Sequence, residues 1–455
     1  MEMILEFLRD VLSQPALLIG IMSCVGLIAL KRPFHKIMTG TLKPILGYLM
    51  LAAGAGVIVS NLDPLGKMIE HGFHITGVVP NNEAIVAVAQ KVLGVETMSI
   101  LVVGLLMNLL IARFTKFKYV FLTGHHSLFM ACLMSAVLGT VGLSGIELIL
   151  VGGFLMGAWS AISPAIGQSY TSKVTDGDEI ALGHFGSLGY YLSAWVAKYV
   201  GKAEESTEDI EIPEKWGFLR DSTLSTALTM IVFYLIAAIA AGSEFVATLS
   251  DSMSPYLFAV MSAMNFSVGV AIVYSGVRMI LGDLIPAFQG IATKIIPNAI
   301  PAVDCAVFFT YAPTAVVLGF ISSFIGGIIG MLILGAIGGV LIIPGLVPHF
   351  FCGATAGIYG NATGGRRGAA VGAFLNGLAI TFLPALALPV LGQLGFQNTT
   401  FGDADFAVMG LVLGNAFEWI GMAGIYGVVV IAALVLFIPN FIKTKGKVIN
   451  YVEEE

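Results

Sequence analysis

Long apolar segments recur along the whole chain and constrain its fold more than any other feature. Segments 12–30, 98–112 and 422–438 contain no charged residue, and each approaches the length of about 20 residues that a helix needs to cross a bilayer. Hydrophobic residues make up 57% of the 455 residues and charged residues 11%, whereas soluble domains carry about a quarter charged residues. We therefore predict an all-α polytopic membrane protein without a separate soluble domain.

The distribution of Lys and Arg predicts how the chain is oriented. Basic residues gather at 31–43, 113–118 and 443–447, and basic loops beside a span stay in the cytoplasm. We expect the N-terminus outside, the C-terminus in the cytoplasm and an odd number of crossings. The N-terminus lacks a basic region followed by a small-residue cleavage site, so we expect the first apolar segment to be a span and not a signal peptide.

Regular and irregular apolar segments alternate along the chain. The regular ones predict spans near 12–30, 98–112, 145–167, 224–247, 257–281, 369–391 and 407–438. Five irregular segments mix apolar residues with Gly, Pro, His or Asp: 44–61, 119–142, 183–199, 285–315 and 342–364. Non-helical backbone inside a membrane requires surrounding protein or a water-filled cavity. The irregular segments therefore indicate broken helices and re-entrant hairpins around a solute site.

A polar insertion near the middle divides the chain. We expect a first transmembrane half at 1–200, a cytoplasmic linker at 201–222, a second transmembrane half at 223–447 and a cytoplasmic tail at 448–455. The triplet Ile45-Leu46-Gly47 has an echo in Ile280-Leu281-Gly282. Transporters are often built from inverted repeats whose broken helices hold the solute, so we expect two inverted-repeat halves.

The sequence offers no catalytic constellation. Its four cysteines lie in apolar segments without CxxC or His/Cys ligand spacing, which indicates buried thiols and neither a disulfide framework nor a metal site. Walker and GxSxG motifs are absent from the sequence. We expect no catalytic nucleophile, no metal, no cofactor and no nucleic-acid partner.

Three ionisable residues in irregular segments are candidates for solute binding, because such groups are costly inside a membrane. Asp304 is flanked by apolar residues, and His125 and His184 each follow a glycine. Their side chains can exchange hydrogen bonds with solute hydroxyls. The alternatives are a structural ion pair of Asp304 with Arg278, Lys294 or another cation, and histidines whose hydrogen bonds are satisfied by the protein itself.

Two further segments can contribute to such a site. Gly54 and Ala55 can bring backbone donors close to a solute, since glycine permits close approach. Asn82 and Glu83 follow a proline and suit either a site or an ordinary extracellular turn.

Together these segments make the sequence similar to a known family, the membrane-embedded C component (enzyme IIC permease) of the ascorbate-type phosphoenolpyruvate-dependent phosphotransferase system, within the ascorbate–galactitol superfamily. The similarity extends nearly end to end. The motifs that carry it are Lys43 to Gly56, Leu122-Thr123-Gly124-His125, Val174-Thr175-Asp176-Gly177, Gly183-His184, Glu204-Glu205-Ser206, Gly276-Val277-Arg278-Met279, Ala302-Val303-Asp304-Cys305-Ala306, Tyr311-Ala312-Pro313 and Ile342-Ile343-Pro344-Gly345.

The resemblance implies a homodimer in the bacterial inner membrane, surrounded by lipid. Each protomer would have about eleven transmembrane helices with re-entrant hairpins, in a core domain that holds the substrate and a dimerisation domain. The solute, L-ascorbate in this family, would enter from outside by an elevator-like movement of the core. A cytoplasmic B component carrying a phosphocysteine would phosphorylate it.

The resemblance also implies which residues contact the substrate, and two of them depart from the family pattern. The implied contacts are Gly54, Ala55, Asn82, Glu83, His125, Phe129, His184, Phe185 and Asp304. Family members place glutamine where Phe129 and Phe185 stand, and a Thr-Tyr pair near Asn82 and Glu83. Sites built on hydrogen bonds discriminate strongly when a partner is missing, so the expected solute is L-ascorbate or a related sugar or sugar acid. The two rings can stack on a sugar or simply fill space.

A second hypothesis comes from a different class of transporter. Asp304 could carry the coupling proton of a secondary transporter for a small polar solute, because proton relays use intramembrane carboxylates. Such a transporter would need no phosphoryl donor.

Overall fold

The computed structural model describes residues 11, 14–74, 77–80, 82–210, 222–250, 253–392 and 399–441. The first part of the chain forms α2 (Pro15–Ala29), α3 (Phe34–Gly72), α4 (Asn82–Phe114), α5 (Gly124–Thr140), α6 (Gly145–Thr175) and α7 (Ser187–Val200). The second part forms α8 (Ser222–Ala241), α9 (Ser243–Leu249), α10 (Pro255–Lys294), the short 3-10 helix η2 (Cys305–Thr310), α11 (Pro313–Ala336), α12 (Leu346–Gly392), α13 (Ala404–Ile420) and α14 (Met422–Phe441).

These helices confirm the prediction of an all-α polytopic membrane protein. Among the described residues, seven helices are long and apolar enough to cross a membrane, or eight if α8 and α9, which meet at 116°, form one broken span. The expected number of eleven crossings stays a prediction. The expected tail at 448–455 lies outside the described residues, and so does the part of the expected linker at 211–221.

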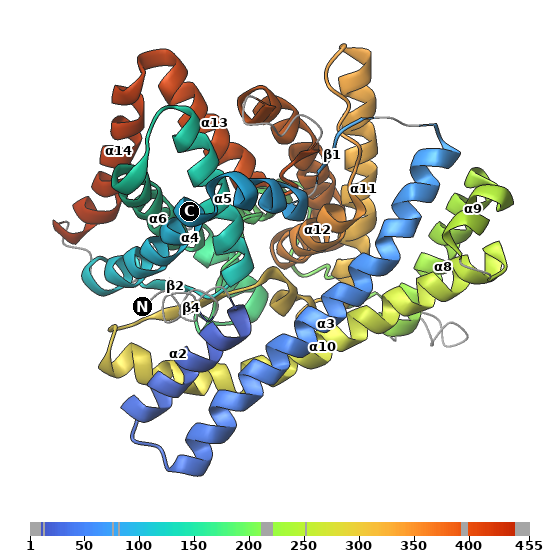
Figure 1. The fold of residues 1–455 in the computed structure, drawn as a ribbon. Coiled ribbons are helices and arrows are strands. Elements are labelled where there is room, and N and C mark those ends of the chain that lie inside the picture. The colour runs from blue at the N-terminus through green and yellow to red at the C-terminus, as the bar shows by residue number, and fades with distance from the viewer. Residues whose placement is uncertain are drawn as a thin grey trace.

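The long helices α3 and α10 cross each other along one side of the molecule (Figure 1). Gly47 and Gly54 of α3 face Gly276 and Gly269 of α10, and a Cβ on any of the four would lie 2.6–2.9 Å from the opposite backbone oxygen. The pairing runs in opposite directions, so the helices are antiparallel. Small residues let membrane helices pack at their backbones. We call α2, α3, α8, α9 and α10 the scaffold.

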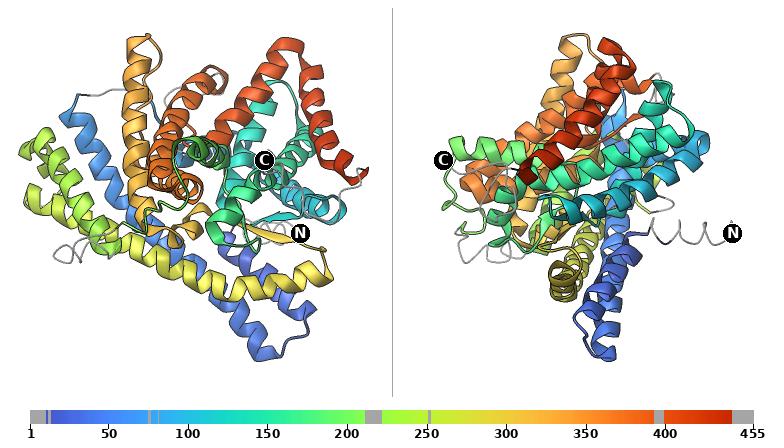
Figure 2. Two further views of the ribbon diagram at one scale, coloured as in Figure 1. Left: turned by 180° about the vertical axis from the view of Figure 1, so that it is seen from behind. Right: turned by 90° about the vertical axis from the view of Figure 1, so that its left-hand side faces the viewer.

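The remaining helices, α4 to α7, η2 and α11 to α14, pack together on one side of the crossed helices α3 and α10 (Figure 2). We call them the bundle. A buried parallel sheet lies in the bundle, with strand order β2 (Tyr119–Phe121), β4 (Ile300–Val303) and β3 (Ala181–Leu182). A second pair joins β1 (Val79–Pro80) to β5 (Thr399–Thr400). Strands β2 and β4 belong to the irregular segments 119–142 and 285–315, and β3 directly precedes the irregular segment 183–199.

The structure corrects three of the expected segment boundaries. Segment 44–61, expected to be broken, lies in the continuous helix α3, because its glycines serve the contact with α10. Segment 407–438, expected to be one span, is divided between α13 and α14 at Gly421, whose φ is 62°. Segment 342–364 belongs to α12 from Leu346 onward, and segment 369–391 belongs to the same helix, which is kinked at Gly364 and Gly365.

Candidate functional site

Three turns meet where the strands of the central sheet end. Phe121 and Ala181 both pair with Ala302 in a parallel register, so the three chains leave the sheet at the same edge. The turn after β2 carries His125, the turn after β4 carries Asp304, and the turn after β3 carries His184. The strand register therefore brings together residues that are far apart in the sequence.

The Asp304 carboxylate contacts a nearby backbone N–H group and an imidazole. It is 7% exposed. One carboxylate oxygen accepts a hydrogen bond from the Ala306 N–H at 3.1 Å and caps η2, while the other lies 3.4 Å from His125 Nε2. The Tyr48 hydroxyl lies 3.1 Å from His125 Nδ1 on the other side of the ring. A chain of polar groups thus runs from α3 through His125 to Asp304.

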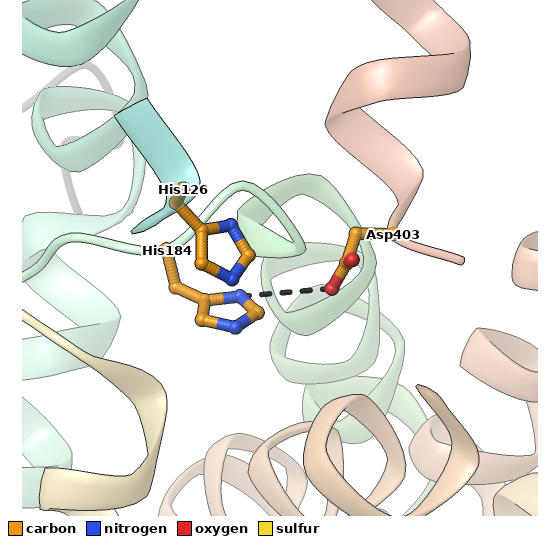
Figure 3. Close-up of side chains that lie close together, drawn as sticks. All are labelled: His126, His184 and Asp403. Atoms are coloured by element: carbon orange, nitrogen blue, oxygen red, sulfur yellow. Dashed lines mark ion pairs between the residues drawn. The ribbon is translucent and has the colours of Figure 1, made fainter. Parts of the chain in front are cut away.

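His126 and His184 form a second, fully enclosed pair, drawn in Figure 3. Their ring centroids are 3.7 Å apart. The Phe185 N–H donates to His126 Nδ1 at 3.3 Å, and the Gly186 N–H donates to His184 Nδ1 at 3.1 Å. A neutral imidazole that accepts through Nδ1 carries its proton on Nε2. The hydrogen-bond pattern therefore assigns the Nε2–H tautomer to both rings.

Asp403 closes this cluster from the segment before α13. Its carboxylate lies 3.9 Å from His184 Nδ1 (Figure 3) and accepts hydrogen bonds from Asn82 Nδ2 at 2.6 Å and from the Cys352 thiol at 2.9 Å. Asn82 Oδ1 in turn accepts from the Gly402 N–H at 2.9 Å. The Asp403 carboxylate therefore binds the candidate residue Asn82 and lies beside His184.

The donor atoms of His126, His184 and Asp403 lie within 4.8 Å of one another, as do those of His184, Asp304 and Cys305. Two imidazoles and a carboxylate could in principle hold a transition metal. However, the Nδ1 atoms already accept backbone N–H groups, and Asp403 already accepts from Asn82 and Cys352. This donor set fits a hydrogen-bond network better than a metal centre.

The two phenylalanines occupy different environments. The Phe185 ring is completely buried and stacks on Phe121 with centroids 4.6 Å apart. The Phe129 ring meets His125 edge to face at 5.8 Å and is 9% exposed. Phe185 therefore fills space behind the histidines, whereas Phe129 lies beside the imidazole that pairs with Asp304.

The remaining candidates lie on α3 and α4. Gly54 belongs to the contact between α3 and α10, because a Cβ there would meet Gly269 and Val273. Ala55 and Glu83 lie in helices, but their side chains are outside the described part of the structure. The structure does not bring Gly54 into contact with the histidine cluster.

Sequence reasoning missed Tyr48, His126 and Asp403. Tyr48 carries no charge, and nothing in its apolar surroundings distinguishes it from a packing residue. His126 directly follows the candidate His125. Asp403 stands in Gly402-Asp403-Ala404-Asp405 before an apolar segment, and the rule that intramembrane carboxylates are functional candidates applies to it as it does to Asp304.

A small cavity adjoins Asp304 at the boundary between scaffold and bundle. Tyr48, Thr123 and Asp304 provide its polar lining, and Ile19, Leu51, Leu122, Ile280, Val303 and Val307 provide the rest. Its volume of about 10 Å³ has room for roughly one water molecule. A sugar-sized solute can therefore reach Asp304 here only if scaffold and bundle separate.

Comparison with known proteins agrees with this architecture. Residues 10–405 match the model of the family described as PTS system sugar-specific permease component, EIIC-GAT. The chain is also similar to the ascorbate-specific PTS system EIIC component of Mycoplasma pneumoniae, with 26% identity over 417 residues that cover 78% of this chain. The chain spans 62% of that relative's length.

The family match covers most of the chain, and the structure supplies the apolar helices that a permease requires. The resemblance inferred from the motifs is thereby confirmed. The chain is a multi-pass membrane protein and belongs to the family of sugar-specific permease components of the phosphotransferase system.

Proposed function

We propose that this chain is the translocating subunit that imports L-ascorbate or a related sugar or sugar acid. The observation that carries this proposal is the meeting of His125, His184 and Asp304 at one sheet edge in a chain of the permease family. Imidazole and carboxylate groups suit a solute rich in hydroxyls. The name of the Mycoplasma pneumoniae relative supports ascorbate as the first solute to test.

Phosphorylation of the solute is assigned to a cytoplasmic B component that carries a phosphocysteine. Cys132, Cys305 and Cys352 of this chain are buried, which suits packing better than phosphoryl transfer. Recognition and translocation would then belong to this chain and the chemistry to its partner.

An elevator-like displacement of the bundle against the scaffold is the proposed movement. Two observations support it: the candidate site lies at the boundary between these parts, and the cavity there is far smaller than a sugar. In this proposal the bundle is the core domain and the scaffold forms the interface of a homodimer in the bacterial inner membrane.

We also propose about eleven crossings, an outside N-terminus, a cytoplasmic C-terminus and two inverted-repeat halves, 1–200 and 223–447, joined by the linker 201–222. The antiparallel contact of α3 with α10 supports inverted repeats, because each helix contributes two glycines seven residues apart, Gly47 and Gly54 on α3 and Gly269 and Gly276 on α10. The segment 448–455 would be a cytoplasmic tail.

Uptake of radiolabelled L-ascorbate tests the proposal. Cells that express this chain together with its B component should accumulate phosphorylated solute, and deletion of the B component should abolish accumulation. Proteoliposomes holding this chain alone should not respond to an imposed pH gradient. Gradient-driven accumulation of unmodified solute would instead support the proton-coupled transporter. A panel of pentoses, hexitols and sugar acids then establishes the solute if ascorbate is not taken up.

A further inference from the structure

Tyr48 joins the scaffold to the candidate site. Its side chain extends from α3 and is 6% exposed, and its hydroxyl lies 3.1 Å from Nδ1 of His125. The other nitrogen of His125 lies 3.4 Å from Asp304. A scaffold hydroxyl therefore ends a chain of polar groups whose other members belong to the bundle.

The cavity beside this contact contains an unused polar group. The Thr123 hydroxyl is buried and has no hydrogen-bond partner among the described residues, and Thr123 lines the cavity together with Tyr48 and Asp304. Thr123 precedes α5 without capping it through its side chain. A buried hydroxyl without a partner costs free energy, so the cavity wall is already equipped for a hydroxylated ligand.

We propose that the Tyr48 hydroxyl occupies the place of a solute hydroxyl at His125, and that solute binding displaces it and releases the bundle from the scaffold. This inference rests on the proposed function. A phenolic and an aliphatic hydroxyl offer the same donor and acceptor groups, and a ring nitrogen has one lone pair to accept with. Occupation of His125 Nδ1 by the solute and by Tyr48 is therefore mutually exclusive.

The displacement has a thermodynamic consequence. If the contact with Tyr48 and the bound solute exclude each other, each weakens the other by the same factor, because coupling between two binding events is reciprocal. The contact would hold the bundle against the scaffold while the site is vacant and yield when solute arrives. If the Tyr48 hydroxyl only provided a hydrogen-bond partner for His125, it would stabilise the protein without competing with solute binding.

The first experiment needs no solute. Thr123→Cys places a thiol on the cavity wall of the purified full-length protein, and mass spectrometry follows its reaction with a small methanethiosulfonate reagent. Tyr48→Phe removes only the hydroxyl and should speed this reaction by about 2- to 10-fold, the factor that one hydrogen bond supplies. The matched control is Tyr234→Phe, because the buried Tyr234 hydroxyl donates to Asn61 O within the scaffold. Equal rates for the two variants would overturn the inference.

The second experiment measures L-ascorbate binding by calorimetry in proteins with Thr123 intact. Tyr48→Phe should tighten binding by about 2- to 10-fold, while Tyr234→Phe should leave it unchanged. Unchanged or weaker binding by Tyr48→Phe would show that the hydroxyl does not compete with the solute, and the inference would fail.

The outcomes separate the inference from the proposed function. If Asp304→Asn binds and transports ascorbate like the wild type, the proposed site is wrong, whatever Tyr48→Phe does to thiol labelling. If Asp304→Asn loses binding but Tyr48→Phe matches Tyr234→Phe in both experiments, the site stands and the displacement by solute is wrong.

Discussion

At the scale of single residues, a substitution at Asp304 can remove the negative charge of the side chain without changing its size or position. Asp304→Asn keeps the volume and one oxygen for the Ala306 N–H but removes the charge that faces His125. We expect uptake to fall at least tenfold, because a charge-assisted hydrogen bond is about twice as strong as a neutral one, while folding is retained. Initial uptake rates and size-exclusion profiles measure this. The control Asp63→Asn removes an exposed carboxylate paired with Lys67, and an equal loss in both variants would refute a specific role of Asp304.

Asp405 positions the turn that carries His184. Its carboxylate accepts hydrogen bonds from Trp159 Nε1 at 3.2 Å, Ser187 Oγ at 2.7 Å and the Leu188 N–H at 2.9 Å, and its own N–H donates to Phe185 O. Asp405→Ala leaves three donors without their acceptor, so we expect a loss of about 3 kcal/mol or more in unfolding free energy.

Thermal unfolding followed by tryptophan fluorescence measures that loss. Ser187→Ala removes a single donor and should cost about 1–3 kcal/mol. If the two variants unfold at the same temperature, Asp405 does not hold the turn through these bonds.

At the scale of elements, the crossing of α3 and α10 depends on the absence of side chains. A Cβ at Gly54 would lie 2.7 Å from Gly269 O and 2.8 Å from Val273 N, whereas a Cβ at Gly56 would meet no atom of the described residues within 4 Å. Gly54→Ala should therefore lower the unfolding temperature, and Gly56→Ala should leave it equal or raise it, because alanine favours helix by about 1 kcal/mol over glycine. Equal effects of the two substitutions would show that the close crossing contributes nothing to stability.

At the scale of the whole molecule, transport by the proposed displacement requires scaffold and bundle to separate. Leu51 of the scaffold and Val307 of the bundle line the same small cavity. A bifunctional thiol reagent that joins Leu51→Cys to Val307→Cys should abolish uptake, and reduction should restore it.

The control joins two elements of the bundle. Thr97 and Ser135 form a buried hydrogen bond at 2.7 Å between α4 and α5, and cross-linked Thr97→Cys with Ser135→Cys should leave the proposed movement free. Each single cysteine variant should also transport. Undiminished uptake by the cross-linked Leu51→Cys and Val307→Cys pair would exclude the displacement.

The sequence determined the class of the molecule because a bilayer imposes requirements that can be read residue by residue. The length of the apolar segments and the scarcity of charged residues predicted membrane helices. The motifs around His125, His184 and Asp304 predicted the family. Charge inside an apolar segment marked Asp304, and the same reasoning would have marked Asp403. What made these predictable is that each depends on a residue and its immediate neighbours in the chain.

Only the tertiary structure decided how the candidate residues meet. The strands of two to four residues that bring the three turns to one edge have no period by which sequence alone could separate them from buried helix. Gly54 turned out to serve a helix crossing, and Tyr48 proved to join the scaffold to His125. These contacts join positions tens to hundreds of residues apart, and their partners are fixed by packing and strand register, not by local sequence.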